Sequence, residues 1–283
     1  MRSNYEIYPV KGDHARLARE ALSTVLFIEF VRQTCDDFIA LRRGRGFLGE
    51  NELIGGSATI GSHSVFALLY CKNEHSGNSR SSAPASVRLS GYRAAQHLMG
   101  LAYKFNRPVV VFTTSQTSLR SACMAEPHEA IRFGNHIFSL CRLEVPIILA
   151  VLSRLSSGDI FGAWLADKIL ALEQTRFSMT ILDQEKNIRV QVGAKCLLHQ
   201  GIIDQTVPLP SGGMYDSQVT MPKPKRLRAA LSKMLEEVSH VSPKELMIRR
   251  KEKIERISKI ASRTFGMETR IEMPSSNGSI API

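Results

Sequence analysis

Two stretches of sequence decide the fold class: residues 108–114 read PVVVFTT and residues 145–152 read VPIILAVL. Both are short, continuous apolar runs, and the first is rich in β-branched side chains, which is typical of strands buried on both faces. Between them, from about Glu126 to Arg142, apolar residues recur at helical spacing. A strand, a helix and a second strand in this order predict a largely parallel sheet covered by helices.

The alternation continues in both directions along the chain. Upstream, strands at 54–60 and 64–71 flank a Gly61-Ser62 turn and predict a hairpin, and a helix is expected at 90–105. Downstream, we expect a short helix near 158–166, strands at 168–173 and 177–182, a helix near 192–200 and a last strand at 203–207. The predicted class is α/β.

Helices are also predicted at both ends of the chain. From about Ala15 to Arg42 an apolar stripe predicts a long amphipathic helix with room for one break, and charged helices are expected at 225–239 and 243–262. Residues 72–85 are polar and predict an exposed loop. We divide the chain into an N-terminal helical segment (1–50), an α/β core (51–213), basic C-terminal helices (214–265) and a flexible tail (266–283).

The composition is that of an ordinary globular protein, with 283 residues of which 43% are hydrophobic and 22% charged. The five cysteines are scattered without a C-x-x-C pair, so neither a disulfide framework nor a zinc ribbon is expected. The sequence shows no signal-peptide pattern and no apolar run of membrane-spanning length. We therefore expect a cytoplasmic protein that does not enter the membrane.

Several short segments then stand in a distinctive order. They are DDFIAL at 36–41, GYRAA at 91–95, LEVPI at 143–147, ADK at 166–168, GIID at 201–204 and ELMIRR at 245–250. In this order they resemble the alpha subunit of the acetyl-CoA carboxylase carboxyltransferase, a member of the crotonase superfamily. The resemblance covers roughly residues 25–262.

The resemblance implies a crotonase-like spiral of repeated ββα units with an N-terminal helix and a C-terminal helical extension. It also implies a transferase subunit that pairs with a carboxyltransferase beta subunit in an α2β2 hetero-oligomer. The complex would receive carboxybiotin on a biotin carboxyl carrier protein, charged by an ATP-dependent biotin carboxylase. It would pass the carboxyl group to acetyl-CoA, forming malonyl-CoA for fatty acid biosynthesis. Biotin stays on the carrier, and no metal is expected in this chain.

The expected site residues follow from the same resemblance. Carboxyl transfer develops negative charge on both the thioester and the biotin, and backbone N–H groups at a helix start suit both. Gly158 and Ser157 are the candidate catalytic oxyanion donors, and Ser156, Gly212 and Gly213 are the candidate contacts to carboxybiotin and its carrier. Simpler interpretations stay open: a loop glycine at 158, serines that cap the next helix, and an ordinary turn at 212–213.

The chain departs from the family pattern near these residues. Residues 153–161 read SRLSSGDIF where the family has a glycine-rich segment, and the loop at 114–120 has no glycine. Leu155 and Asp159 are expected to crowd or repel an anion there. An alternative function is therefore a catalytically degenerate scaffold or regulatory paralogue of the alpha subunit.

The net charge of +11 is concentrated near the C-terminus, because residues 222–263 carry +8 of it. A nucleic-acid-binding surface is one interpretation, but the segment lacks interleaved aromatic residues. We favour a surface that faces a partner subunit, an acidic carrier or the anionic coenzyme A.

Overall fold

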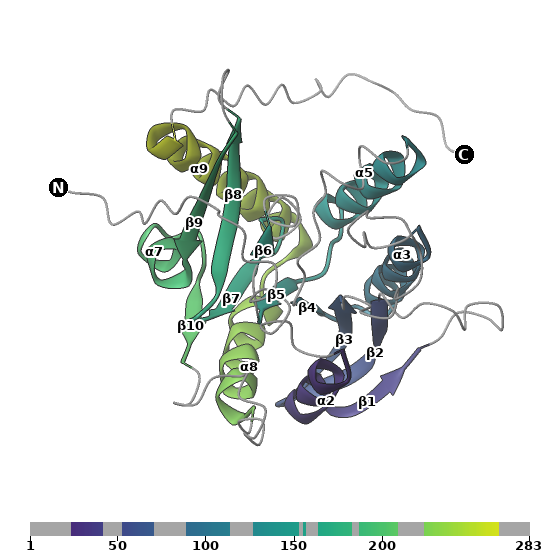
Figure 1. Ribbon diagram of the computed structural model, residues 1–283. Helices are drawn as coiled ribbons and strands as arrows, with labels where there is room; N and C mark the ends of the chain where they lie inside the picture. The colour runs from purple at the N-terminus through teal and green to yellow at the C-terminus, as the bar shows by residue number, and fades with distance from the viewer. Residues whose placement is uncertain are drawn as a thin grey trace, which may run out of the picture.

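The computed structural model describes residues 24–41, 53–70, 89–113, 127–152, 155–156, 164–182, 187–208 and 224–265. These residues form a large sheet with helices on both faces and a small second sheet beside it (Figure 1). The helices are α2 (Thr24–Thr34), α3 (Leu89–Lys104), α5 (Pro127–Cys141), α7 (Ala194–His199), α8 (Lys225–Ser239) and α9 (Pro243–Phe265). The strands are β1 (Asp36–Ala40), β2 (Leu53–Ile60), β3 (His63–Tyr70), β4 (Val109–Thr113), β5 (Ile147–Val151), β6 (Leu155–Ser156), β7 (Lys168–Leu172), β8 (Arg176–Leu182), β9 (Asn187–Gly193) and β10 (Gln205–Val207).

The seven-stranded sheet has the order β1-β2-β3-β4-β5-β7-β10. Strands β3, β4, β5, β7 and β10 are parallel, whereas β1, β2 and β3 pair antiparallel. The predicted hairpin is confirmed as β2 and β3, joined at Gly61, whose φ of 63° lies in the left-handed region that favours glycine. The two apolar stretches that predicted the parallel centre are β4 and β5, which pair directly.

Two hydrophobic cores lie on opposite faces of this sheet. One core packs α3, α5 and the small sheet against it, with Ile257 of α9 buried at its edge. The other core is made with α2 and α8, through side chains such as Phe30, Leu231 and Leu235. Figure 1 shows the same division, with α3, α5 and α9 on one side of the strands and α2 and α8 on the other. The C-terminal helices are therefore built into both faces of the fold.

The structure corrects the prediction of one long helix at 15–42. The helix ends at Thr34, and Asp36–Ala40 form the edge strand β1. Asp37 has a φ of 50°, and Arg228 of α8 binds the carboxylate of Asp36, with Nη1 2.7 Å from Oδ1. Pairing with β2 satisfies the backbone of this segment, so a tertiary contact overrides its helical spacing. The part of the predicted helix before residue 24 lies outside the described residues.

Two further strands were not expected from the sequence. Residues 187–193 form β9, which pairs antiparallel with β8, and Leu155–Ser156 form β6, which pairs parallel with β8. Together they make the three-stranded second sheet. The predicted helices of 90–105, 126–142, 225–239 and 243–262 are confirmed as α3, α5, α8 and α9. The predicted loop at 72–85 and the tail at 266–283 fall outside the described ranges.

Candidate functional site

The carboxyl ends of the central strands form one level edge. Tyr70 of β3 is in register with Thr113 of β4, Thr113 with Val151 of β5, and Val151 with Ala171 of β7. In open sheets with parallel strands, ligands bind outside such carboxyl ends. We call this the carboxyl edge of the sheet.

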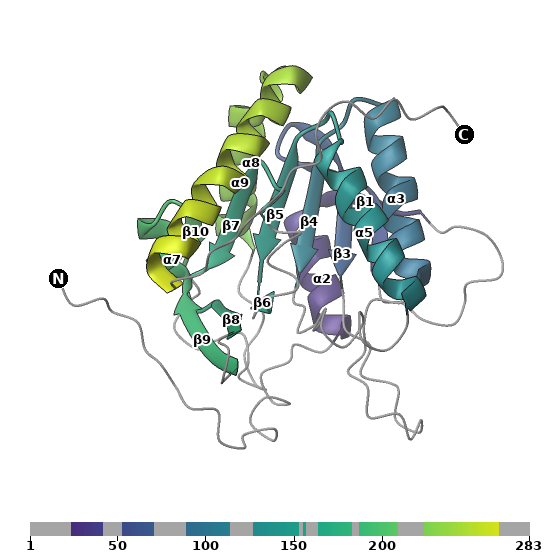
Figure 2. The same cartoon turned by 90° about the horizontal axis from the view of Figure 1, so that it is seen from above.

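After β5 the chain leaves the large sheet and enters the small one. The amide of Leu152 donates to the carbonyl of Thr113 at 3.0 Å, and the buried hydroxyl of Thr175 donates to the carbonyl of Val151 at 3.3 Å. The chain then forms β6, where Ser156 is in register with Ser178 of β8. Figure 2 shows β6, β8 and β9 beyond the arrow tips of β4 and β5. The backbone of Ser156 is therefore held at the carboxyl edge.

Leu155 does not crowd this edge, contrary to the expectation from the sequence. Its side chain is 1% exposed and belongs to the same hydrophobic core as Phe177 and Val192. The residue that replaces a family glycine is thus a packing residue, which the sequence pattern alone did not reveal.

The other four predicted site residues, Ser157, Gly158, Gly212 and Gly213, lie outside the described residues, as does Asp159. Trp164, which follows the segment at 153–161, packs against the core on the α3 and α5 face of the sheet.

The opposite edge carries a buried ion pair. Arg250 of α9 donates from Nε to Oδ1 of Asp167 at 2.8 Å and from Nη2 to Oδ2 at 2.6 Å. Their side chains are only 3% and 5% exposed. Arg250 also donates to the carbonyls of Leu143 and Val145, and Oδ2 of Asp167 accepts the amide of Ile147 at 2.7 Å. The pair therefore joins α9 to the first residue of β5.

A second ionic group lies beside it at the starts of β7 and β10. Asp204 accepts the amide of Ile169 at 2.8 Å, and its carboxylate lies 3.5 Å from Nζ of Lys253 and 3.9 Å from Nζ of Lys168. Lys253 is 8% exposed, and burial lowers the pKa of its ammonium group, although the neighbouring Asp204 opposes this. Asp167, Asp204 and Arg250 stand in the segments ADK, GIID and ELMIRR, but the sequence alone did not assign them to a site. The sequence signal that could have identified this site is a single aspartate directly before each strand, Asp167 before β7 and Asp204 before β10.

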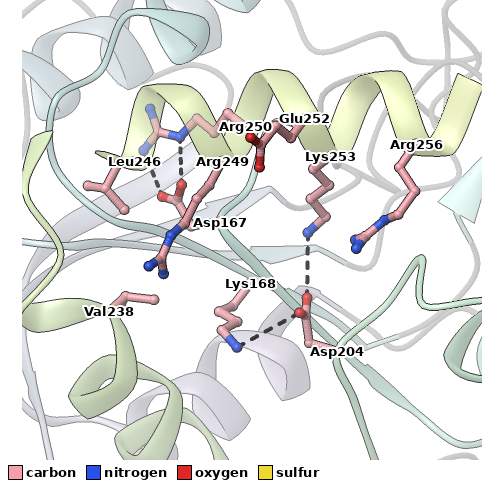
Figure 3. A pocket seen from close by; sticks show the side chains of 10 residues that line it. All are labelled: Asp167, Lys168, Asp204, Val238, Leu246, Arg249, Arg250, Glu252, Lys253 and Arg256. Atoms are coloured by element: carbon pink, nitrogen blue, oxygen red, sulfur yellow. Dashed lines mark hydrogen bonds and ion pairs between the residues drawn. The ribbon is translucent and has the colours of Figure 1, made fainter. Parts of the chain in front are cut away.

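A cavity of about 420 Å³ opens between these groups, α8 and α9 (Figure 3). It is lined by Asp167, Lys168, Asp204, Val238, Leu246, Arg249, Arg250, Glu252, Lys253 and Arg256. We call it the amino-edge cavity, because β5, β7 and β10 all begin there. It lies at the other end of the strands from Ser156 and is therefore not the predicted transfer site.

The described part of the chain holds no group of three or more histidine, cysteine, aspartate or glutamate side chains that could bind a metal ion. None of the helices in the described ranges is long and apolar enough to cross a membrane.

The family model described as "Acetyl co-enzyme A carboxylase carboxyltransferase-like" matches residues 10–258. The chain belongs to this family. Among curated relatives, the acetyl-coenzyme A carboxylase carboxyl transferase subunit alpha of Exiguobacterium sibiricum is 26% identical, with 81% of this chain and 78% of that protein covered. The subunit alpha of Streptococcus thermophilus is also 26% identical, with 87% of this chain and 99% of that protein covered.

Solved structures of low sequence identity share the fold. A Pseudomonas malonate decarboxylase hetero-tetramer in complex with coenzyme A aligns with a TM-score of 0.56 at 12% identity, over 83% of this chain and 95% of that one. Transcarboxylase 12S with hydrolysed methylmalonyl-coenzyme A bound aligns with a TM-score of 0.50 at 13% identity, over 75% of this chain and 40% of that one. The chain is thus a member of the carboxyltransferase-like family with the predicted crotonase-like α/β fold.

Proposed function

We propose that this chain is the alpha-type subunit of a biotin-dependent acetyl-CoA carboxyltransferase. With a beta subunit it would transfer a carboxyl group from carboxybiotin on a carrier protein to acetyl-CoA, giving malonyl-CoA. The family match over residues 10–258 supports the class of reaction. The position of β6 supports a specific site for this reaction. This strand lies at the carboxyl edge of the sheet, and Ser157 and Gly158 follow it directly in the sequence.

The proposed role of the chain is to stabilise negative charge without an ionised side chain. Carboxybiotin, when bound, supplies the carboxyl group, and the CoA thioester accepts it. The backbone N–H groups of Ser157 and Gly158 would donate to the oxyanion that develops as the bond forms. Such donors fit a site that directly follows a short strand held in a ladder, because the ladder with β8 fixes the backbone before them. Gly212 and Gly213 would border the surface that meets the carrier.

Removing one N–H tests this role. Gly158→Pro deletes the donor, because proline has no backbone N–H, whereas Gly158→Ala keeps it. With the cognate beta subunit and carboxybiotin on its carrier, we expect Gly158→Pro to lower malonyl-CoA formation by about 100-fold to 1,000-fold, the usual cost of one oxyanion donor. Gly158→Ala should stay within a few-fold of the unsubstituted chain.

The controls are the α–β complex, measured by size-exclusion chromatography, and the thermal midpoint of each variant. Equal activity of the proline and alanine variants in intact complexes would remove Gly158 from the mechanism.

A degenerate scaffold is the second candidate, and the loss of glycines from residues 153–161 favours it. In that case the unsubstituted chain would form a stable complex with the beta subunit and show only background transfer. Restoring glycine at Ser156 and Asp159 should then create activity. Leu155 is left unchanged in this design, because its side chain fills the core and its removal would leave a cavity.

A further inference from the structure

The amino-edge cavity lies between three elements. Val238 lies in α8, the residues from Leu246 to Arg256 lie in α9, and Asp167, Lys168 and Asp204 stand at the starts of β7 and β10. At about 420 Å³ it falls within the range of small-molecule sites, about 300–1,000 Å³. Its volume therefore allows a ligand larger than a single ion.

Positive charge dominates the lining. Five of its side chains are Lys or Arg and three are carboxylates. Arg250 and Asp167 form a buried pair with each other, and among the lining residues only Asp204 and Glu252 carry negative charge to match the four other cations. Figure 3 shows Arg249, Lys168, Lys253 and Arg256 arranged around the opening.

Lys253 is the buried member of this group. Its side chain is 8% exposed, and its ammonium group has three N–H donors. One meets the carbonyl of Ala166 at 3.0 Å, and a second meets Asp204 at the long distance of 3.5 Å. Burial of an ammonium group is costly unless it is fully paired, so a further acceptor on the cavity side would complete its coordination.

Two of the other cations are held from outside the cavity by weak pairs. Glu245 binds Arg249 at 2.7 Å, and Glu237 binds Lys168 at 2.9 Å. Both carboxylates are more than 40% exposed, and neither lines the cavity. Exposed pairs contribute about 0–1 kcal/mol, so Arg249 and Lys168 can exchange them for a ligand that is more strongly charged.

We propose that the amino-edge cavity binds a phosphate dianion, free or as a small organic phosphomonoester. Arg249 and Arg256 present guanidinium groups, which suit the bidentate geometry of phosphate oxygens. Lys253 and Lys168 add point charges from the floor. The site is separate from the carboxyl edge, so the inference stands whether or not the proposed carboxyl transfer is correct.

Calorimetric titration of the full chain tests the site, at constant ionic strength set with chloride. The probes are inorganic phosphate, phenyl phosphate and, as a monoanion control, acetate. We expect both phosphates to bind and acetate not to bind. Tighter binding of phenyl phosphate would indicate an organic ligand in contact with Val238 and Leu246, and equal affinities would indicate free phosphate.

Exposed arginines provide variants that should not disturb folding. Arg249→Gln and Arg256→Gln should each weaken phosphate binding about tenfold, because each removes a charge-assisted hydrogen bond. Lys259→Gln is the matched control, since Lys259 is an exposed cation of the same helix outside the lining. It should change the affinity less than twofold.

Two outcomes would overturn the site. One is the absence of phosphate binding to the unsubstituted chain at millimolar concentration. The other is equal weakening by Lys259→Gln, which would show a general attraction to a basic helix.

Discussion

Two arginines next to each other in α9 have very different surroundings. Arg250 is 3% exposed and bound to Asp167, whereas Arg249 is 58% exposed and bound to Glu245 within the same helix. Asp167→Asn should destabilise the protein by about 3–5 kcal/mol, because it leaves a buried guanidinium without its counter-charge. Glu245→Gln should cost less than about 1 kcal/mol. Urea unfolding followed by circular dichroism measures both.

Replacing Arg250, the partner of Asp167, provides the control for this prediction. If the loss comes from an unpaired charge, Arg250→Met combined with Asp167→Asn should be less destabilising than the sum of the single changes. A buried pair that could lose one member for under 1 kcal/mol would contradict this account.

At the residue scale the sequence did not show how the side chains of its motifs interact. Asp167 and Arg250 stand in recognisable motifs, yet 83 residues separate them and no local pattern pairs them. The role of Leu155 was also hidden in the sequence. Its position in a family motif suggested that it would crowd a bound anion, but its side chain is buried in the core. Contacts between distant parts of the chain determine both the ion pair and the burial of Leu155, and the spacing of residues along the sequence does not predict such contacts.

The element most dependent on tertiary contact is the edge strand β1. A side chain at Gly56 of β2 would overlap the backbone at Ile39 of β1, so the two strands can approach only because this residue is glycine. We expect Gly56→Ala to destabilise the protein by about 1–3 kcal/mol, the cost of overpacking against a backbone that cannot move freely.

Gly100 is the matched control for this substitution. It lies on the exposed side of α3, and a Cβ there would meet no heavy atom of the described residues within 4 Å. Gly100→Ala should therefore stabilise by about 0.5–1 kcal/mol through helix propensity. Chemical denaturation measures the unfolding free energy of both variants. Equal effects of the two substitutions would contradict the claim that the close approach of β1 and β2 requires glycine at position 56.

The elements that the sequence predicted well are those with strong local patterns. Strands β4 and β5 are continuous apolar runs, and α8 has buried residues at helical spacing. In contrast, Asp36–Ala40 continued the helical pattern of α2, and Asn187–Gly193 carried no clear strand signal. Each becomes a strand because a neighbouring strand offers it a ladder of hydrogen bonds.

The stability of the whole molecule should depend on pH through His136. Burial lowers its pKa from 6.5 to about 4, so the folded protein keeps the ring neutral where the unfolded chain protonates it. The unfolded state therefore binds more protons between these values, and stability falls as the pH drops from 6.5 towards 4. We expect a loss of roughly 1.5 kcal/mol between pH 6.5 and pH 5.

Comparison of two histidine variants isolates this contribution. His136→Gln should flatten the dependence of unfolding free energy on pH in this range, whatever its effect on the absolute value. His97→Gln replaces an exposed histidine of α3 and should leave the slope unchanged. An unaltered slope in the His136 variant would show that another group controls the acid sensitivity.

The basic C-terminal segment also looks different at the scale of the whole molecule. Arg228, Arg250 and Lys253 use their charge on Asp36, Asp167 and Asp204 of the same chain. Three of the eight surplus positive charges of residues 222–263 are thus paired with carboxylates elsewhere in the fold. Exposed cations remain on α8, at Lys225, Arg226 and Lys233, as well as at the amino-edge cavity and on the exposed face of α9.

The ion pairs of α9 have a consequence for synthesis on the ribosome. Asp167 is made 83 residues before Arg250, and Asp204 is made 49 residues before Lys253. At about 5–20 residues per second, these carboxylates emerge roughly 2–17 seconds before their partners. During that interval the starts of β7 and β10 cannot bury the charges of Asp167 and Asp204, so we expect the nascent sheet to stay open at this edge. Among the described helices, α9 is the last to be made, and it is the one that allows these strands to close.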